Sequence, residues 1–356
     1  MRQMRTIYLI RHGRPDVPLQ ARLCIGRTDL PLGAPGRMQA CLLAQELDGR
    51  AVTAVFSSPL RRTRETAAFL SPEPIVKNGL EEISVGDWEG LDFSEIARRW
   101  PALYAARGSD PATPIPNAED AAHAQARFLA AVEAALAASR GDIAIVAHMA
   151  VNQALLCHAA GRPPHAGREF PFPHGAYCVL TYDGAYHIAR PPALPEKPLT
   201  PRLAERLLDA ADPGERVKAH CRAVAREALR IAGALPRPPD RELLAAAALL
   251  HDAARGERRH AETGAAWLRL LGYDDAAALV AQHHDFTGGT LDAAALLFLA
   301  DKCVQEDRRV SLEARFQASR AACRDSAALR AHEARRRTAL ALKEQVNSIC
   351  GGEVVL

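Results

Sequence analysis

Hydrophobic positions in the first half of the chain fall into short unbroken runs, separated by longer stretches of helical periodicity. Four apolar residues stand together at 7–10 (IYLI), and similar runs occupy 51–56 and 142–147. Unbroken apolar runs of this length are typical of strands buried on both faces of a parallel sheet. The intervening residues 36–47, 60–70 and 121–138 favour helices. Strands alternating with helices predict an α/β domain of three layers with a mostly parallel sheet.

The pattern changes after residue 190. Residues 190–202 (RPPALPEKPLTPR) are rich in proline, which removes backbone donors and indicates an extended linker. Beyond them, apolar residues recur at intervals of three and four, as on amphipathic helices. Further helices are predicted from Asp240, a good N-cap, to His251, and over 263–271, 275–283, 291–305 and 321–343. We therefore predict an α/β domain at 1–190, a linker at 191–202 and an all-α domain at 203–356.

Composition supports two globular domains and argues against several classes of partner. A chain of 356 residues exceeds one ordinary core. Its net charge of +3 gives no reason to expect nucleic acid or a membrane surface, and no run of 18 uncharged apolar residues could span a membrane. The eight cysteines are scattered, and no export signal precedes them, which favours reduced thiols and a cytoplasmic location. The oligomeric state is left open.

Residues that suit phosphate chemistry follow the predicted strands. The three strand ends carry Arg11 and His12, then Ser57-Ser58 ahead of Arg62, and finally His148. Because ligands collect at the carboxyl ends of parallel strands, we expect these side chains to converge. A neutral imidazole can attack phosphorus, and guanidinium groups bind phosphate oxygens bidentately. An acid for the leaving oxygen could come from Glu81 or Glu82.

Five motifs along residues 5–190 carry a family resemblance. In order they read RHG at 11–13, GRTDLPL at 26–32, SSPLRRTRETA at 57–67, LEEI at 80–83 with GDWEG at 86–90, and VAH at 146–148. A chain with these motifs in this order resembles the histidine phosphatase (phosphoglycerate mutase-like) superfamily. The resemblance implies a phosphatase domain of that fold, which needs no cofactor.

The resemblance also implies roles for individual residues. His12 would be the phosphorylated nucleophile, Glu82 the proton donor, and Arg11, Arg62 and His148 the phosphate pocket. Pro18 replaces an asparagine of the mutases, which favours hydrolysis over phosphoryl exchange. Specificity is expected to lie in loops such as residues 94–117. Four other histidines of this half are expected to be surface or core residues without partners: His158, His165, His174 and His187.

Residues with metal-ligand chemistry sit among the predicted helices of the second half. His251 and Asp252 end an apolar helix, and Asp301 follows the apolar run 293–300. A buried carboxylate there needs a cation or a strong donor. Together with His220, these residues form a mixed nitrogen and oxygen set that suits Mn, Fe, Co, Ni or Mg, with Zn also compatible.

This order of residues, with AALLHDAAR at 247–255 and LADK at 299–302, resembles the HD-domain metal-dependent phosphohydrolases over about residues 215–318. The resemblance implies a helical bundle that binds a divalent metal through His220, His251, Asp252 and Asp301. Further candidates lie where relatives carry ligands of a second metal or contacts to substrate: His260, His283, His284 and Lys302.

We therefore expect a bifunctional phosphohydrolase. The first half would hydrolyse a phosphomonoester through a phosphohistidine, and the second would hydrolyse a nucleotide or another phosphorylated small molecule with a metal. Two alternatives stay open. The second half could be a nucleotide-sensing regulatory module, or the first half could be a phosphoglycerate mutase-like phosphotransferase.

Overall fold

The computed structural model describes residues 4–352, which form two compact units divided after Lys197. Each unit has a core of its own and is considered by itself. Among the described residues, no helix combines the length and the apolar character needed to cross a membrane.

A six-stranded sheet with the order β3-β2-β4-β1-β5-β6 forms the centre of the first unit. β1 to β4 run parallel, whereas β5 is antiparallel to both β1 and β6. The mostly parallel sheet expected from the apolar runs is confirmed. The strands are Arg5–Arg11 (β1), Val52–Ser57 (β2), Ile75–Val76 (β3), Asp142–Ala147 (β4), Tyr177–Tyr182 (β5) and Tyr186–Ala193 (β6).

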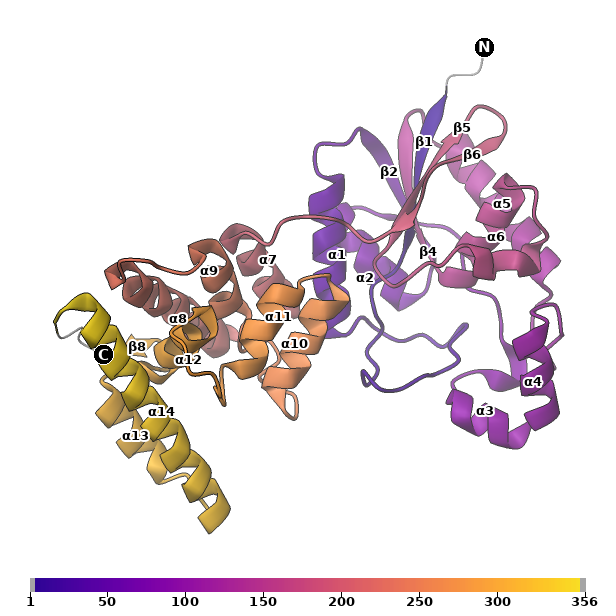
Figure 1. Ribbon diagram of the computed structural model, residues 1–356. Coiled ribbons are helices and arrows are strands. Elements are labelled where there is room, and N and C mark those ends of the chain that lie inside the picture. The colour runs from indigo at the N-terminus through magenta and orange to yellow at the C-terminus, as the bar shows by residue number, and fades with distance from the viewer. Residues whose placement is uncertain (1–3, 353–356) are drawn as a thin grey trace. The chain divides into compact units, whose positions relative to one another are not determined.

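Helices cover both faces of this sheet, giving the expected three layers (Figure 1). Ile7 and Leu9 of β1 face α5 and α6, whereas Tyr8 and Ile10 face α1 and α2. Both faces of the strand are buried, which explains its unbroken apolar run. Burial of each large apolar side chain contributes about 1.5–3 kcal/mol. The covering helices are Ala34–Leu47 (α1), Arg61–Leu70 (α2), Ala121–Ala137 (α5) and Met149–Ala159 (α6).

Two short helices occupy the segment that we expected to be a loop at residues 94–117: α3 (Phe93–Arg99) and α4 (Pro101–Ser109). Asp92 caps α3 through a hydrogen bond from Ser94 N, and Pro101 fills the first turn of α4, both favourable helix starts. Short 3₁₀ turns lie at Gly86–Trp88 (η1) and Pro164–Glu169 (η2).

The chain leaves the first unit through β6, which follows a hairpin turn at residues 183–185. Only residues 194–200 of the proline-rich segment lack regular structure, because β6 extends to Ala193 and α7 begins at Pro201. The buried carboxylate of Glu46 ties this exit to the domain. It accepts a hydrogen bond from Tyr177 Oη at 2.7 Å and pairs with Lys197 Nζ at 3.3 Å and Arg50 Nη2 at 3.1 Å.

The second unit is helical, as expected. α12 lies at its centre and contacts α8, α9, α11, α13 and α14, and its residues 294–302 are all buried. Asp240 caps α9 as predicted, accepting hydrogen bonds from Glu242 N and Leu243 N. The helices are Pro201–Ala211 (α7), Glu215–Ala234 (α8), Arg241–Leu250 (α9), His260–Leu270 (α10), Asp274–Gln282 (α11), Ala293–Lys302 (α12), Leu312–Arg320 (α13) and Ser326–Cys350 (α14).

Two predicted helix boundaries in this unit are wrong. The helix expected over 291–305 ends at Lys302, and a small hairpin follows, formed by Val304–Gln305 (β7) and Arg308–Arg309 (β8). The helix expected over 321–343 is α14, which begins at Ser326 behind an Asp325 cap and packs beside α13 (Figure 1). Polar residues cover most of α14, so periodicity gave a weak signal for its ends.

Candidate functional site

His12 stands directly beyond the carboxyl end of β1, with 4% of its surface exposed. Its Nδ1 lies 2.7 Å from the carbonyl oxygen of Gly13, so Nδ1 carries the proton and donates it there. Nε2 is left with its lone pair and accepts a hydrogen bond from Arg62 Nε at 3.1 Å. Burial, followed by the charges of Arg62 and Arg11, holds the pKa of His12 well below its usual 6.5. The ring is therefore a neutral imidazole with Nε2 available as nucleophile.

Arg62 comes from the first turn of α2 and is almost completely buried. Its Nη1 and Nη2 donate to the carbonyl oxygens of Thr28 and Gly26, both at 2.7 Å. The loop that supplies these carbonyls is held in turn by Glu89. That carboxylate accepts hydrogen bonds from the backbone of Gly26, Arg27 and Thr28 and from Thr28 Oγ1.

His148 follows β4, the parallel neighbour of β1, and its ring centroid lies 5.1 Å from that of His12. Arg62 Nη2 donates to His148 Nδ1 at 3.2 Å, so the proton sits on Nε2, 2.9 Å from Ser58 Oγ. Burial, with His12 and Arg62 as further causes, lowers the pKa of His148 well below 6.5. The site therefore holds His148 as a neutral imidazole.

Arg11 adds a second guanidinium beside His12 and contacts His174, a histidine that was not expected at this site. Arg11 Nη1 donates to Phe172 O at 2.6 Å, and Nη2 lies 2.8 Å from His174 Nε2. The ring of His174 is 5.3 Å from that of His12, so the expectation that His174 has no partner is wrong. Arg11 Nε is buried without a hydrogen-bond partner among residues 4–352, and burial lowers the pKa of Arg11 to about 10. An unpartnered donor of this kind suits an anion.

Glu82 reaches the N-terminus of α6, the helix that starts directly after His148. Its oxygens accept from Ala150 N at 3.1 Å, Val151 N at 3.3 Å and Ile83 N at 2.9 Å. A cavity of about 240 Å³ adjoins these residues, lined in part by Ile83, Ala150 and Val151. The carboxylate thus has a fixed position beside space for a small organic group.

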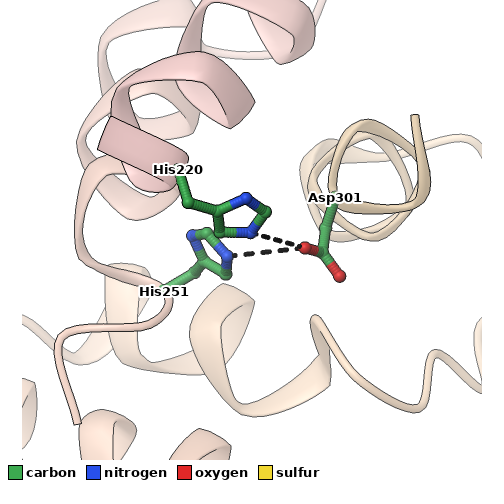
Figure 2. A group of neighbouring side chains, drawn as sticks. All are labelled: His220, His251 and Asp301. Carbon is green, nitrogen blue, oxygen red and sulfur yellow. Dashed lines mark hydrogen bonds and ion pairs between the residues drawn. The ribbon is translucent and has the colours of Figure 1, made fainter. Parts of the chain in front are cut away.

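The second unit brings together two histidines and an aspartate from α8, the end of α9 and the end of α12. His220 Nε2 lies 3.1 Å from Asp301 Oδ1, and His251 Nε2 lies 3.6 Å from the same oxygen (Figure 2). The ligand atoms of these three residues all lie within 4.8 Å of one another. His251 and Asp301 are buried, and His220 is partly buried.

Hydrogen bonds at the far side of each ring define the tautomers of three histidines. Nδ1 of His220, His251 and His283 lies 2.7–2.8 Å from the carbonyl oxygens of Glu306, Ala248 and Val280, respectively. Each Nδ1 therefore donates, and in the neutral ring this leaves a lone pair on Nε2. Nε2 of His251 and of His283 is buried without a hydrogen-bond partner in the described chain. Lone pairs that face carboxylate oxygens need a cation between them, so this donor set fits a divalent metal.

Asp252 lies between two groups of histidines. Its Oδ2 is 4.0 Å from His220 Nε2 and 3.8 Å from His251 Nε2. Its Oδ1 is 3.2 Å from His260 Nε2 and 3.5 Å from His283 Nε2. His251, Asp252 and His283 form a second set with metal-ligand geometry.

The other candidates surround this cluster. Lys302 Nζ pairs with Asp301 Oδ2 at 2.6 Å, and Arg255 Nη1 pairs with Asp252 Oδ2 at 2.9 Å. His284 lines the adjoining cavity and stacks edge-on against His260, but it belongs to neither set of ligand atoms found in the described residues. The cavity has a volume of about 720 Å³.

The chain is a phosphoester-hydrolysing enzyme with a helical second domain, in which histidines and aspartates form groups that could hold a metal ion. Residues 7–189 match the family description of the histidine phosphatase superfamily (branch 1), and the chain belongs to this superfamily. Residues 217–306 match the HD domain. The fusion of the two domains that the motifs indicate is confirmed, and HD domains typically depend on divalent metals.

Several relatives and solved structures are similar to about half of this chain. A Bacillus subtilis (strain 168) protein named uncharacterized phosphatase PhoE is 30% identical over 167 residues, covering 45% of this chain and 80% of that protein. A Yersinia enterocolitica protein named probable phosphoglycerate mutase GpmB is 30% identical over 176 residues, covering 47% of this chain and 80% of that protein. The solved structure described as mycobacterial hydrolase 2 aligns with a TM-score of 0.51 and 26% identity over 59% of this chain and 97% of that one.

Sequence reasoning missed two features of these sites. His174 has no local motif, and only the fold brings it beside Arg11, 163 residues away along the chain. The α13–α14 side of the large cavity lies beyond the HD match, which ends at residue 306. No motif marks His332 in the sequence, and only the structure shows that this residue is buried.

Proposed function

We propose that the first unit hydrolyses a phosphomonoester with His12 as the nucleophile. The observation that carries this proposal is the hydrogen bond from Arg62 Nε to an unprotonated His12 Nε2. It directs the nucleophilic lone pair toward the same guanidinium that would hold the phosphoryl oxygens. Arg11, with its unpartnered Nε, and His148 complete the phosphate pocket.

The reaction takes two displacements. In the first, His12 Nε2 forms a bond to phosphorus, the bond from phosphorus to the leaving oxygen breaks, and Glu82 gives that oxygen a proton. In the second, a water oxygen attacks phosphorus, the phosphorus–nitrogen bond breaks, and Glu82 takes the proton of the water. The 240 Å³ cavity beside Glu82 would hold the organic group of the substrate. Its size favours a small metabolite.

For the second unit we propose a metal-dependent phosphohydrolase. His220, His251, Asp252 and Asp301 would hold one ion, and Asp252 would share a second ion with His260 and His283, since its two oxygens face the two groups. A bound divalent ion supplies Lewis-acid activation of the phosphoester and of water. The backbone carbonyls that accept from Nδ1 keep the histidine rings in place, and Lys302 and Arg255 would bind phosphate oxygens.

Two single variants of the full chain test this two-centre function. His12→Ala should lower p-nitrophenyl phosphate hydrolysis in EDTA by about a thousandfold or more, because no other group replaces the nucleophile. Asp252→Ala should abolish Mn²⁺-dependent hydrolysis of a nucleoside phosphate panel and leave the first activity intact. Matched controls are His187→Ala and Asp275→Ala, both exposed and outside the sites.

Three results would contradict parts of the proposal. Full retention of every activity in both variants would exclude both centres. Phosphoryl exchange between substrate positions without release of phosphate would indicate a mutase. Nucleotide binding by the second unit that alters the first activity, without Mn²⁺-dependent turnover, would indicate a regulatory module.

A further inference from the structure

The large cavity of the second unit has two chemically different sides. One side carries the proposed metal ligands His220, Asp252 and Asp301. The other side is formed by α13 and α14 and includes Arg315, Phe316, Ser319, Ala328, Ala331 and His332. A volume of about 720 Å³ is in the range of pockets that enclose whole small-molecule ligands. Inorganic phosphate or pyrophosphate at the metal ligands would leave the α13–α14 side unfilled.

His332 offers an unused hydrogen-bond acceptor on that side. Its Nε2 lies 3.1 Å from the carbonyl oxygen of Phe316 and 3.0 Å from Ser319 Oγ. Because a carbonyl oxygen can only accept, Nε2 carries the proton. In the neutral ring Nδ1 is then an acceptor, and it is buried with no partner among residues 4–352. The ring is held edge-on against Phe316, with centroids 5.4 Å apart.

Arg315 offers an unused donor on the same side. Its Nε is buried without a hydrogen-bond partner in the described part of the chain. Buried polar atoms in folded proteins are normally paired, so a wall with an unpaired acceptor and an unpaired donor indicates a ligand that supplies both counterparts. The neighbouring Phe316, Ala328 and Ala331 add apolar surface.

We infer that α13 and α14 form a nucleoside subsite, in which Arg315 and His332 hydrogen-bond the base or sugar of a nucleotide whose phosphate lies at the His220–Asp252–Asp301 cluster. This inference rests on the proposed function of the second unit. A nucleoside carries donors and acceptors on a largely planar group, which matches the wall. An alkyl phosphate or an inorganic polyphosphate carries no such group.

Equilibrium binding tests the subsite without requiring turnover. The full-length His12→Ala chain is titrated by calorimetry, with Mn²⁺ and then with EDTA, using the 5′-methylenephosphonates of adenosine, guanosine, cytidine and uridine. Methylphosphonate is the comparator without a nucleoside. At least one nucleoside phosphonate should bind about tenfold or more tightly than methylphosphonate in the Mn²⁺-dependent signal.

Single-residue variants test whether Arg315 and His332 cause the preference for nucleoside phosphonates. Arg315→Met and His332→Phe should each lower the affinity for the preferred nucleoside phosphonate by about tenfold, the effect of losing one good hydrogen bond, and leave methylphosphonate unchanged. Arg320→Met is the matched control, since Arg320 lies on the same helix, pairs with Glu333 and does not line the cavity. Arg315→Met decides the case if His332→Phe does not fold.

The outcomes separate the inference from the proposed function. Equal binding of nucleoside phosphonates and methylphosphonate, or equal affinities in Arg315→Met and Arg320→Met, overturns the subsite. Nucleoside-selective binding with no Mn²⁺-dependent hydrolysis supports the subsite and overturns the hydrolytic function. If the chain hydrolyses nucleotides and the Arg315 and His332 variants bind the nucleoside phosphonates as tightly as the parent chain, the hydrolytic function is supported and the subsite is overturned.

Discussion

At the scale of single residues, the first site depends on two histidines that stay neutral, His12 and His148. His12 and His148 are both buried, and burial is the leading reason that each pKa lies well below 6.5. His12 Nε2 therefore has a lone pair, and no neighbouring base is needed to remove a proton from it. A serine nucleophile would need such a base, whereas the proposed nucleophile His12 does not.

This arrangement predicts the acid side of the pH profile. Because protonation of His12 requires a pH well below 6.5, kcat/KM of the first unit should stay level as the pH falls through 6.5 and decline only further down. Arg62→Met removes one of the charges that lower this pKa, so the decline should move to higher pH. Stopped assays of p-nitrophenyl phosphate hydrolysis in EDTA across the acid range measure both profiles. A wild-type midpoint at or above 6.5 contradicts the assignment.

The same pKa shifts act on stability. The unfolded chain takes up a proton on each of these histidines near pH 6.5, whereas the folded chain does not. The free energy of unfolding should therefore fall as the pH drops below 6.5, by up to about 1.4 kcal/mol per pH unit for each histidine.

At the scale of elements, β1, β2 and β4 could be predicted because each carries a run of apolar residues that is buried on both faces of the sheet. Their carboxyl ends then placed His12, Arg62 and His148 together. α3 and α4 could not be predicted in this way, since α4 has no buried residue and α3 has only one, Ile96. His174 was missed because a loop residue reaches the site only through tertiary structure.

The loop at residues 26–28 of the first unit holds Arg62 in place, a role that could not be predicted from its sequence. Residues 26–28 supply two carbonyl oxygens to Arg62, and Glu89 holds that loop through its backbone N–H groups. Glu89→Ala should therefore lower kcat/KM by about ten- to a hundredfold, because Arg62 loses its fixed orientation, with little change in the pH profile. The same assay measures it, and Glu73→Ala at an exposed position is the control. Unchanged activity would mean that the loop is positioned without Glu89.

At the scale of the whole molecule, the chain joins two sites with different requirements. The proposed phosphate pocket of the first unit consists of histidine, arginine and glutamate side chains, whereas the second unit collects histidines and carboxylates that could hold a metal ion. Sequence motifs identified both halves, because the site residues of each half lie close to the ends of apolar strands or helices. The nucleoside side of the second cavity comes from helices beyond the recognised domain and had no motif.

Metal removal should distinguish the activities of the two units. EDTA should leave p-nitrophenyl phosphate hydrolysis by the first unit within about twofold of its original rate and abolish the activity of the second, with recovery on addition of Mn²⁺. The melting transition of the second unit should also move to lower temperature, since an ion at a hundred times its Kd stabilises the folded state by about 2.7 kcal/mol. Calorimetry with and without Mn²⁺ measures the shift, and Asp252→Ala should show none. Loss of both activities in EDTA would contradict separate sites.

The Glu46 cluster has a practical consequence for dissecting the chain. A fragment that stops at residue 190, the boundary suggested by the proline content, would lose the last three residues of β6 and Lys197, one of the partners of the buried Glu46 carboxylate. A fragment that stops at residue 197 keeps both. We therefore expect the longer fragment to be the more stable of the two, although the additional seven residues contain no helix and no catalytic group.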